Sequence, residues 1–191
     1  MALQGHALLR RTGLEPRATN PMRRIQLFIA TSLDGYIARE DGGIDWLFHD
    51  GDYGFRRFYA GIDTVVMGRK SWELARTLEV EPFAGKRVIV FSRKLKSSPG
   101  AEIARGNVRA FANKLRRARG RHIWLLGGGE LVRDFVAANL IDDYIISVHP
   151  ILIGRGIPLF LKNTRDVKLK ARGAKAFKSG LVQLTYTRSK P

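Results

Sequence analysis

An apolar segment in residues 65–73 ends in glycine and is followed by cations, a combination that can bind an anion. The apolar run ends at Gly68, and Arg69, Lys70 and the hydroxyl of Ser71 come next. If a helix begins here, its first N–H groups have no partner within the helix and the positive end of its dipole faces outward, so a phosphate could bind. The alternative is an ordinary helix start with solvated basic residues.

A second glycine-rich turn lies at residues 123–131, where an apolar run passes through three consecutive glycines, Gly127 to Gly129, into a predicted helix. Glycines allow unusual backbone angles and lack the Cβ atoms that would block a pyrophosphate. A Rossmann dinucleotide fingerprint is not matched, because Val132 stands where that fingerprint has a small residue. A plain turn between a strand and a helix remains the alternative.

Two further segments could complete a nucleotide site. Ser92 and Arg93 follow an apolar run at residues 87–91, and a hydroxyl beside a planar guanidinium suits the 2′-phosphate of a ribose. The same pair is common in ordinary turns. Residues 31–38 and 42–46 form a glycine-punctuated loop that could close over a flat ring and exclude water.

The composition is that of an ordinary globular domain with an excess of positive charge. Of 191 residues, 45% are hydrophobic and 27% are charged, and the formal net charge is +17. We interpret the densest basic cluster, within residues 114–121, as a solvated helix face, and a nucleic-acid-binding domain is the alternative. The absence of cysteine excludes disulfides and thiolate chemistry and fits a reducing compartment such as the cytoplasm. No apolar run reaches the roughly 18 residues of a membrane-spanning helix.

From residue 24 onward, apolar runs alternate with helical patterns. Strands are expected at residues 25–31, 64–67, 87–91, 107–110 and 122–126, and helices at residues 53–60, 71–76, 113–119 and 130–138. In the last third, residues 143–150 and 181–188 alternate as strands do, with a turn or loop at residues 154–158 between them. Residues 1–21 are interpreted as a loose basic extension, and the domain comprises residues 22–191.

These elements predict a single α/β domain, for which the length of the chain is sufficient. Strands joined first by helices and then by loops are typical of a mixed, mainly parallel sheet. We expect about eight strands in this central sheet, with helices on its flanks and an antiparallel ribbon at the C-terminus.

The order of the motifs resembles that of one reductase family, which unites dihydrofolate reductases with the C-terminal reductase domain of the bifunctional riboflavin-biosynthesis deaminase-reductase. The resemblance covers residues 24–188. The Ser-Leu-Asp-Gly loop at residues 32–35 and the segment at residues 140–160 are similar to the riboflavin-type domain. The Met-Gly-Arg-Lys-Ser-Trp-Glu turn at residues 67–73 and the triple glycine are similar to dihydrofolate reductase itself.

The resemblance implies a dihydrofolate-reductase-like fold and an NADPH-dependent reductase acting on a small heterocyclic or carbonyl substrate. It also implies a homodimer formed through the C-terminal ribbon. The nearest known reaction is that of 5-amino-6-(5-phosphoribosylamino)uracil reductase, and dihydrofolate reduction is the alternative. The resemblance places NADPH against Ala30, Ile37, Gly68, Arg69, Lys70, Ser71, Ser92, Arg93, Gly127, Gly128, Gly129, Glu130 and Leu131.

Two departures from the riboflavin-type domain leave the substrate open. That domain has a substrate-binding glutamate just before its paired glycines, where this chain has Gly127. It also has small residues and an acid after its second strand, where this chain has the Arg-Lys-Ser-Trp pattern of residues 69–72. The deaminase signature of His-x-Glu and Pro-Cys-x-x-Cys is absent from the sequence. A protein that binds the nucleotide without turnover is a further alternative.

Hydride addition to a C=N or C=O group requires a proton, so an acid near the nicotinamide is expected. Dihydrofolate reductases hold this acid on the helix before the Met-Gly-Arg strand, and Asp52 has the most similar spacing from Met67. Asp34 is the second candidate. Their alternatives are a helix start for Asp52 and a loop turn for Asp34. His49 could reach the same cleft, but a lone histidine in a polar loop is usually solvated. The histidines lack metal-ligand spacing, so no metal is predicted.

Overall fold

The computed structural model describes residues 22–77, 83–161 and 166–189. The strands are β1 (Ile25–Ser32), β2 (Tyr36–Ala38), β3 (Ile62–Gly68), β4 (Arg87–Phe91), β5 (Glu102–Ala104), β6 (His122–Gly127), β7 (Asp143–His149), β8 (Ile157–Pro158), β9 (Leu169–Ala176) and β10 (Val182–Arg188). The helices are α1 (Phe55–Ala60), α2 (Arg69–Ala75), α3 (Val108–Arg117) and α4 (Gly129–Ala137).

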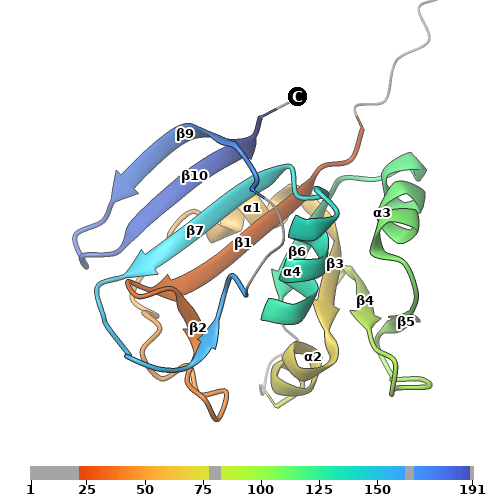
Figure 1. Ribbon diagram of the computed structural model, residues 1–191, viewed down its shortest axis with the longest axis horizontal. Coiled ribbons are helices and arrows are strands. Elements are labelled where there is room, and N and C mark those ends of the chain that lie inside the picture. Colours follow the sequence, from red (N-terminus) through yellow and green to blue (C-terminus); the bar gives the residue numbers. More distant parts are fainter. Residues whose placement is uncertain (1–21, 78–82, 162–165, 190–191) are drawn as a thin grey trace, which may run out of the picture.

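An eight-stranded sheet forms the centre of the molecule, with the strand order β5-β4-β3-β6-β1-β7-β10-β9 (Figure 1). The strands from β5 to β7 in this order pair in parallel. At the other end, β10 pairs antiparallel with both β7 and β9. A small second sheet joins β2 to β8. The predicted fold is therefore confirmed: a mixed, mainly parallel sheet of eight strands that closes in an antiparallel C-terminal ribbon.

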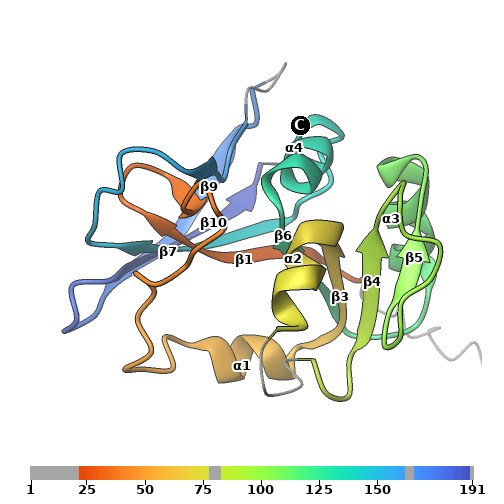
Figure 2. The same ribbon diagram turned by 90° about the horizontal axis from the view of Figure 1, so that it is seen from below.

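Alternation along the strands divides the core between the two faces of the sheet. On β3, Val65 and Met67 pack with Trp72 of α2 and with aromatic residues of α1, whereas Val66 packs with Leu115 of α3 and with residues of α4. We therefore distinguish an α1–α2 face from an α3–α4 face. Figure 2 shows α1 and α4 on opposite sides of the sheet. Buried on both faces, the parallel strands are nearly continuous apolar runs, which is why they were identifiable from the sequence.

The strand predicted at residues 107–110 is wrong, because these residues begin α3. The side chain of Asn107 accepts hydrogen bonds from the N–H groups of Arg109 (2.9 Å) and Ala110 (3.1 Å), as a helix N-cap does. The strand at this edge of the sheet is β5, which precedes the helix and pairs with β4. A run of four residues is too short for its period to separate the two structures.

The short strands and the outermost strand were not predicted. All eight residues of β9 are exposed, and its sequence, Leu-Lys-Ala-Arg-Gly-Ala-Lys-Ala, has no apolar alternation that indicates a strand. It is a strand because its backbone pairs with β10. The expected loose extension at residues 1–21 lies outside the described residues. Among the helices of the described ranges, none has the length and apolar character needed to cross a membrane.

Candidate active site

The two glycine turns lie next to each other at the carboxyl ends of the parallel strands. The last residues of β3 and β6 pair in parallel. A Cβ atom built on Gly128 would come within 3.4 Å of the hydroxyl oxygen of Ser71, so the two turns are in contact. Ligands of open α/β sheets bind outside this end of the strands. We call residues 68–71 and 127–131 the glycine edge.

The three consecutive glycines between β6 and α4, of which Gly127 ends the strand and Gly129 begins the helix, have different surroundings. Gly127 and Gly128 have φ angles of 130° and 67°, which residues with a side chain rarely adopt. A Cβ atom on Gly129 would lie 2.7 Å from the carbonyl oxygen of Pro158, so Gly129 is required by packing. Gly128 is half-buried, and Ser71 is its one neighbour within 4 Å of the missing Cβ. Of the three, Gly128 best fits the approach of a ligand.

Both helices that begin at the glycine edge lack side-chain caps. Gly68 is the N-cap of α2 and Gly128 that of α4, and neither position has a side-chain hydrogen bond. The first N–H groups of both helices are therefore left without side-chain partners. Leu131 is buried in the core and the Glu130 carboxylate would repel an anion, so these two residues could contact a phosphate only through their backbone.

The two cations of the first turn differ in whether a carboxylate forms an ion pair with them. Arg69 binds both carboxylate oxygens of Glu73 at 2.6 Å through one guanidinium nitrogen, which leaves its other nitrogens available. Lys70 is exposed, and within the described ranges it has no ion pair. Lys70 is therefore the uncompensated charge of the glycine edge.

Ser92 and Arg93 lie beside the glycine edge, because Phe91 pairs with Gly68 across β4 and β3. The Ser92 oxygen accepts hydrogen bonds from the N–H groups at positions 94 (3.1 Å) and 95 (2.9 Å), and so closes a turn. Sequence reasoning missed Arg105, whose Nε donates to the Ser92 carbonyl at 3.3 Å. A terminal nitrogen of Arg105 also donates to the Leu95 carbonyl oxygen, so this guanidinium holds the turn in which Arg93 is exposed.

The residues predicted to contact a nicotinamide come from neighbouring elements. Ala30 lies in β1, which contacts β2, the strand that carries Ile37. Ile37 packs against the same core cluster as Ile29. The Ile29 side chain would be 3.1 Å from a Cβ atom on Gly127. Ile37 and Gly127 therefore both adjoin Ile29, whereas Ala30, the next residue of β1, has its side chain on the opposite face of the sheet.

Asp34 connects two loops. It accepts hydrogen bonds from the N–H groups of Ile153 (3.3 Å) and Gly154 (2.7 Å), 119 and 120 residues later in the chain. A hydrogen bond from Ser32, together with these N–H groups, lowers the pKa of the Asp34 carboxyl. A carboxyl that is more acidic than usual is a poor proton donor near neutral pH. The arrangement favours the loop-turn alternative for Asp34.

Asp52 lies just before α1, and its side chain is 42% exposed. Its carboxylate accepts a hydrogen bond from the Arg56 N–H at 3.0 Å and lies 3.7 Å from the Arg56 guanidinium. These contacts are those of a helix start. Asp52 nevertheless precedes Tyr53, whose carbonyl oxygen accepts a hydrogen bond from the Gln183 side chain of β10. His49, in the same loop, is exposed.

Sequence reasoning missed a row of polar residues that crosses the α1–α2 face beside Ala30. Pairing places Ala30 opposite Ser147, Ser147 opposite Gln183, and Gln183 opposite Lys175. Residues directly opposite one another lie on the same face of a sheet. The Gln183 amide nitrogen donates to the Ser147 hydroxyl (3.1 Å) and to the Tyr53 carbonyl (3.0 Å). We call Ser147, Gln183 and Lys175 the polar row.

His149 fixes the loop of residues 44–53 to the end of β7. Its Nε2 accepts a hydrogen bond from the Phe48 N–H (3.2 Å), and its Nδ1 lies 3.3 Å from the Ser147 carbonyl oxygen, to which it donates. The ring packs edge-to-face against Trp46 and Phe48, with centroids 5.2 and 4.9 Å apart. Burial lowers the pKa of His149, which favours the neutral ring that this arrangement requires.

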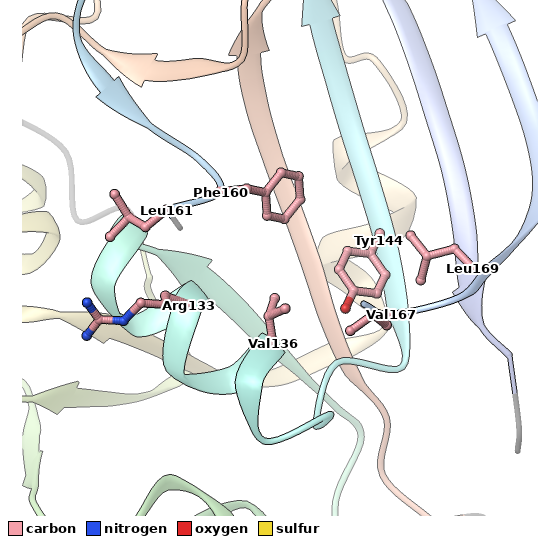
Figure 3. A pocket seen from close by; sticks show the side chains of 7 residues that line it. All are labelled: Arg133, Val136, Tyr144, Phe160, Leu161, Val167 and Leu169. Atoms are coloured by element: carbon pink, nitrogen blue, oxygen red, sulfur yellow. The ribbon is translucent and has the colours of Figure 1, made fainter. Parts of the chain in front are cut away.

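An open apolar pocket of about 190 Å³ lies elsewhere, between α4 and the strands β7 and β9 (Figure 3). Its lining consists of Arg133, Val136, Tyr144, Phe160, Leu161, Val167 and Leu169. None of these seven residues belongs to the glycine edge or the polar row. The seven lining residues include one cation, Arg133, and no carboxyl or imidazole group that could supply the proton for hydride chemistry.

Comparison with known proteins places the chain among riboflavin-type domains. Residues 23–183 match the family model of the RibD C-terminal domain. The uncharacterized protein YwjB of Bacillus subtilis (strain 168) is 42% identical over 173 residues, covering 87% of this chain and 99% of YwjB. A candidate riboflavin biosynthesis protein of Shewanella sp. PV-4 has a structure with a TM-score of 0.80 and 29% identity, covering 87% of this chain and 99% of its own.

Two more distant structures share the fold. The deaminase and 5-amino-6-(5-phosphoribosylamino)uracil reductase of Thermotoga maritima has a TM-score of 0.70 and 16% identity, covering 88% of this chain and 57% of that longer protein. The dihydrofolate reductase of Enterococcus faecalis, solved with NADP(H), has a TM-score of 0.67 and 16% identity, with coverage of 87% and 97%. At these identities the likeness shows the fold alone.

Proposed function

The chain belongs to the RibD C-terminal domain family, and from this membership we propose that it is an NADPH-dependent reductase that transfers a hydride to a small heterocyclic substrate. The reaction we propose resembles that of the 5-amino-6-(5-phosphoribosylamino)uracil reductase of Thermotoga maritima. The observation that carries the proposal is the glycine edge, where two uncapped helix starts meet across Gly128 and Ser71.

The glycine edge fits the pyrophosphate of a dinucleotide. N–H groups at the starts of α2 and α4 can donate to its oxygens, and Lys70 adds a charge that no described carboxylate neutralises. Gly128 leaves open the space that a side chain would fill. Ser71 lies beside this space and can donate its hydroxyl hydrogen.

The turn after β4 supports the choice of NADPH over NADH. Arg93 is exposed at this turn, and guanidinium groups bind phosphate through two parallel hydrogen bonds. Arg105 adds positive charge to the turn, although its guanidinium already donates to the carbonyl oxygens of Ser92 and Leu95. The Ser92 oxygen already accepts from two backbone N–H groups, but its own hydrogen remains free to donate. These groups would hold the 2′-phosphate that NADH lacks.

When bound, NADPH supplies the hydride from its nicotinamide ring. Ala30, Ile37 and Gly127 would orient this ring at the centre of the sheet. Asp52 is our proposed proton-handling or substrate-anchoring residue, because it precedes Tyr53, whose carbonyl oxygen accepts a hydrogen bond from Gln183 of the polar row. Asp34 is the second candidate, although its lowered pKa fits a loop anchor better than an acid. We also propose a homodimer formed through β9 and β10.

Fluorescence titration with NADPH and NADH tests the cofactor assignment. We expect NADPH to bind at least about tenfold more tightly, which corresponds to about 1.4 kcal/mol. Equal affinities, or a preference for NADH, would remove the 2′-phosphate assignment. NADPH oxidation should then be followed with the ribosylaminopyrimidine, dihydrofolate and small carbonyl compounds. Binding without oxidation of any of them would indicate a nucleotide-binding protein without turnover, and salt-sensitive binding of random DNA would favour the nucleic-acid alternative.

A further inference from the structure

A dense group of cations lies at the end of the sheet opposite the glycine edge. Residues 108–121, which comprise α3 and the turn that leads into β6, contain six cations and no carboxylate. Four of these cations are exposed and lie in the last turn of α3 or in the turn that follows it. We call these four residues, Lys114, Arg117, Arg119 and Arg121, the basic end.

The proposed cofactor does not account for the basic end. The glycine edge lies at the carboxyl ends of β3 and β6, whereas Arg121 immediately precedes the first residue of β6. A strand rises about 3.3 Å per residue, so Arg121 lies roughly 20 Å from Gly128. At physiological salt, interactions between exposed charges are largely screened beyond about 8 Å. A phosphate bound at the glycine edge would therefore gain little from these cations.

The carboxylates beside α3 are neutralised by arginines that are themselves largely buried. Asp63 accepts a hydrogen bond from the Arg121 backbone N–H at 2.6 Å, but its ion pair is with Arg23, whose side chain is 3% exposed. Asp142 pairs at 2.6 Å with Arg116, whose side chain is 12% exposed. These carboxylates compensate charges of the interior and leave the exposed cations without a counter-charge.

The basic end itself forms no ion pair within the described ranges. Glu102 feels the charge of Lys114, but both of its oxygens accept hydrogen bonds from Arg87 at 2.7 Å. The Arg121 guanidinium donates to the Ala60 carbonyl at 2.9 Å and keeps its charge. The dipole of α3 contributes only about half a negative charge at this end, so most of the positive charge is uncompensated.

The surroundings of the basic end favour a phosphate polyanion over a protein or a membrane. The buried residues of α3, Ala112 and Leu115, face the core, so the helix has no free apolar face to insert into a bilayer. None of the exposed large apolar side chains of the described ranges lies within residues 108–121, whereas protein interfaces have an apolar centre. Three of the four cations are arginines, whose planar guanidinium groups bind phosphate through parallel hydrogen bonds.

We infer that the basic end binds the phosphate backbone of a nucleic-acid duplex without reading its sequence. Its four cations lie within eight residues, and over roughly 20 Å a duplex carries roughly twelve phosphates. Residues 108–121 expose no aromatic ring on which unpaired bases could stack, so a single strand binds more weakly. This partner is additional to the proposed function, because the duplex and NADPH occupy opposite ends of the sheet.

Fluorescence anisotropy with the full chain and a labelled duplex DNA of about 20 base pairs tests this inference. We expect dissociation constants between about 1 and 100 µM in about 50 mM salt, similar for two unrelated sequences. The logarithm of the binding constant should fall with the logarithm of the salt concentration with a slope of about −3 to −4, as four phosphate contacts require. Saturating NADPH should leave the affinity unchanged, and the single strand should bind more weakly.

A double variant, Arg117→Gln with Arg119→Gln, removes half of the charge of the basic end. It should weaken duplex binding at least about tenfold and make the salt slope shallower by about 1.8. The control, Arg172→Gln with Lys178→Gln, removes the same charge from exposed positions of the C-terminal ribbon, at the other end of the sheet from α3 (Figure 1). It should change duplex binding less than about twofold. Unchanged NADPH affinity and unchanged thermal unfolding show that both variants are folded.

Equal effects of the two double variants would mean that net charge alone attracts the duplex, and would overturn the inference, as would the absence of duplex binding in low salt. Competition by NADPH would also overturn it, because the duplex would then lie at the glycine edge, as expected for a nucleic-acid-binding domain that is not a reductase. Vesicles containing phosphatidylserine that bind more tightly than the duplex would assign the basic end to a membrane instead. A protein that fails to bind NADPH contradicts the proposed function, and the duplex titrations still test the basic end.

Discussion

At the scale of single residues, the consecutive glycines after β6 serve different purposes. Gly129 is required by the nearby carbonyl of Pro158, whereas Gly128 is open to a ligand. We predict that Gly128→Ala lowers NADPH affinity at least about tenfold, because the new methyl group would occupy the space of the pyrophosphate. A fluorescence titration measures the change.

The control for this variant is Gly85→Ala. Gly85 has a similar φ angle of +72°, with nothing within 4 Å of its missing Cβ, and it lies in the turn before β4. Both variants should lose about 1–2 kcal/mol of unfolding free energy from the left-handed backbone. Only the change at Gly128 should affect NADPH binding. Unchanged affinity in a folded Gly128→Ala variant would show that this turn is merely structural.

A single substitution also tests the role of Asp52. Asp52→Asn keeps an oxygen to accept from the Arg56 N–H, so the start of α1 is preserved while the charge and the proton are lost. If Asp52 handles the proton, turnover should fall roughly 10²–10⁴-fold with unchanged NADPH affinity. If it only complements the helix dipole, the loss should be about 0.3–1 kcal/mol of stability with normal turnover.

Asp34→Asn, measured in parallel, tests the second carboxylate. Its hydrogen bonds to the 153–154 backbone predict a loss of stability rather than of turnover. Full activity in both variants would mean that the proton comes from water or from another residue.

At the scale of elements, the loop of residues 44–53 depends on the protonation state of His149. Neutral Nε2 accepts from the Phe48 N–H, and a protonated ring cannot. Because burial lowers the pKa of His149 below 6.5, the unfolded chain binds the proton more readily than the folded one. The stabilisation is therefore present above about pH 6.5 and is lost as the pH falls toward the folded-state pKa.

We predict that the unfolding free energy in urea decreases from pH 7 to pH 5, and that His149→Gln removes most of this dependence. The nearby charges on Asp50 and His49 oppose each other in their effect on the ring, so His49→Gln is the suitable control and should keep the dependence. Trp46 packs against His149, and its fluorescence should change over the same pH range in the wild-type protein and in His49→Gln but not in His149→Gln. A pH-independent stability contradicts this role.

At the scale of the whole molecule, the outer side of the C-terminal ribbon lacks a partner in the described chain. Every residue of β9 is exposed, and Leu169 lines the apolar pocket together with Tyr144 and the exposed Phe160. An exposed edge strand next to an apolar surface favours pairing with another chain. This is the surface through which we propose the homodimer.

We predict a dimer by light scattering, and a monomer for Leu169→Asp, because a carboxylate buried in the interface would be costly. Leu74→Asp, at a similarly exposed leucine of α2, should remain dimeric. A monomeric wild-type protein at micromolar concentration contradicts the homodimer.

The sequence by itself determined the apolar central strands and the two glycine turns in which we propose that an anion binds. Residues 65–73 and 123–131 combine a buried strand, glycine and a helix start within nine residues, so their chemistry is local and follows from their order. The contact between Arg69 and Glu73 likewise follows from a spacing of four on a helix. Prediction from the local sequence pattern failed where the pattern was weak, as at residues 107–110, and where no pattern was present, as in β9.

Only the tertiary structure decided which side chains lie beside Ala30, where we propose that the nicotinamide binds. Ala30, Ser147 and the hairpin residues Lys175 and Gln183 come from three separate parts of the sequence, and they form one row because of the pairing register. A shift of one residue would turn any of these side chains to the other face. Register is set by the packing of both sheet faces, and no local pattern of residues contains it. The two glycine turns could therefore be predicted from the sequence, whereas the polar row required the fold.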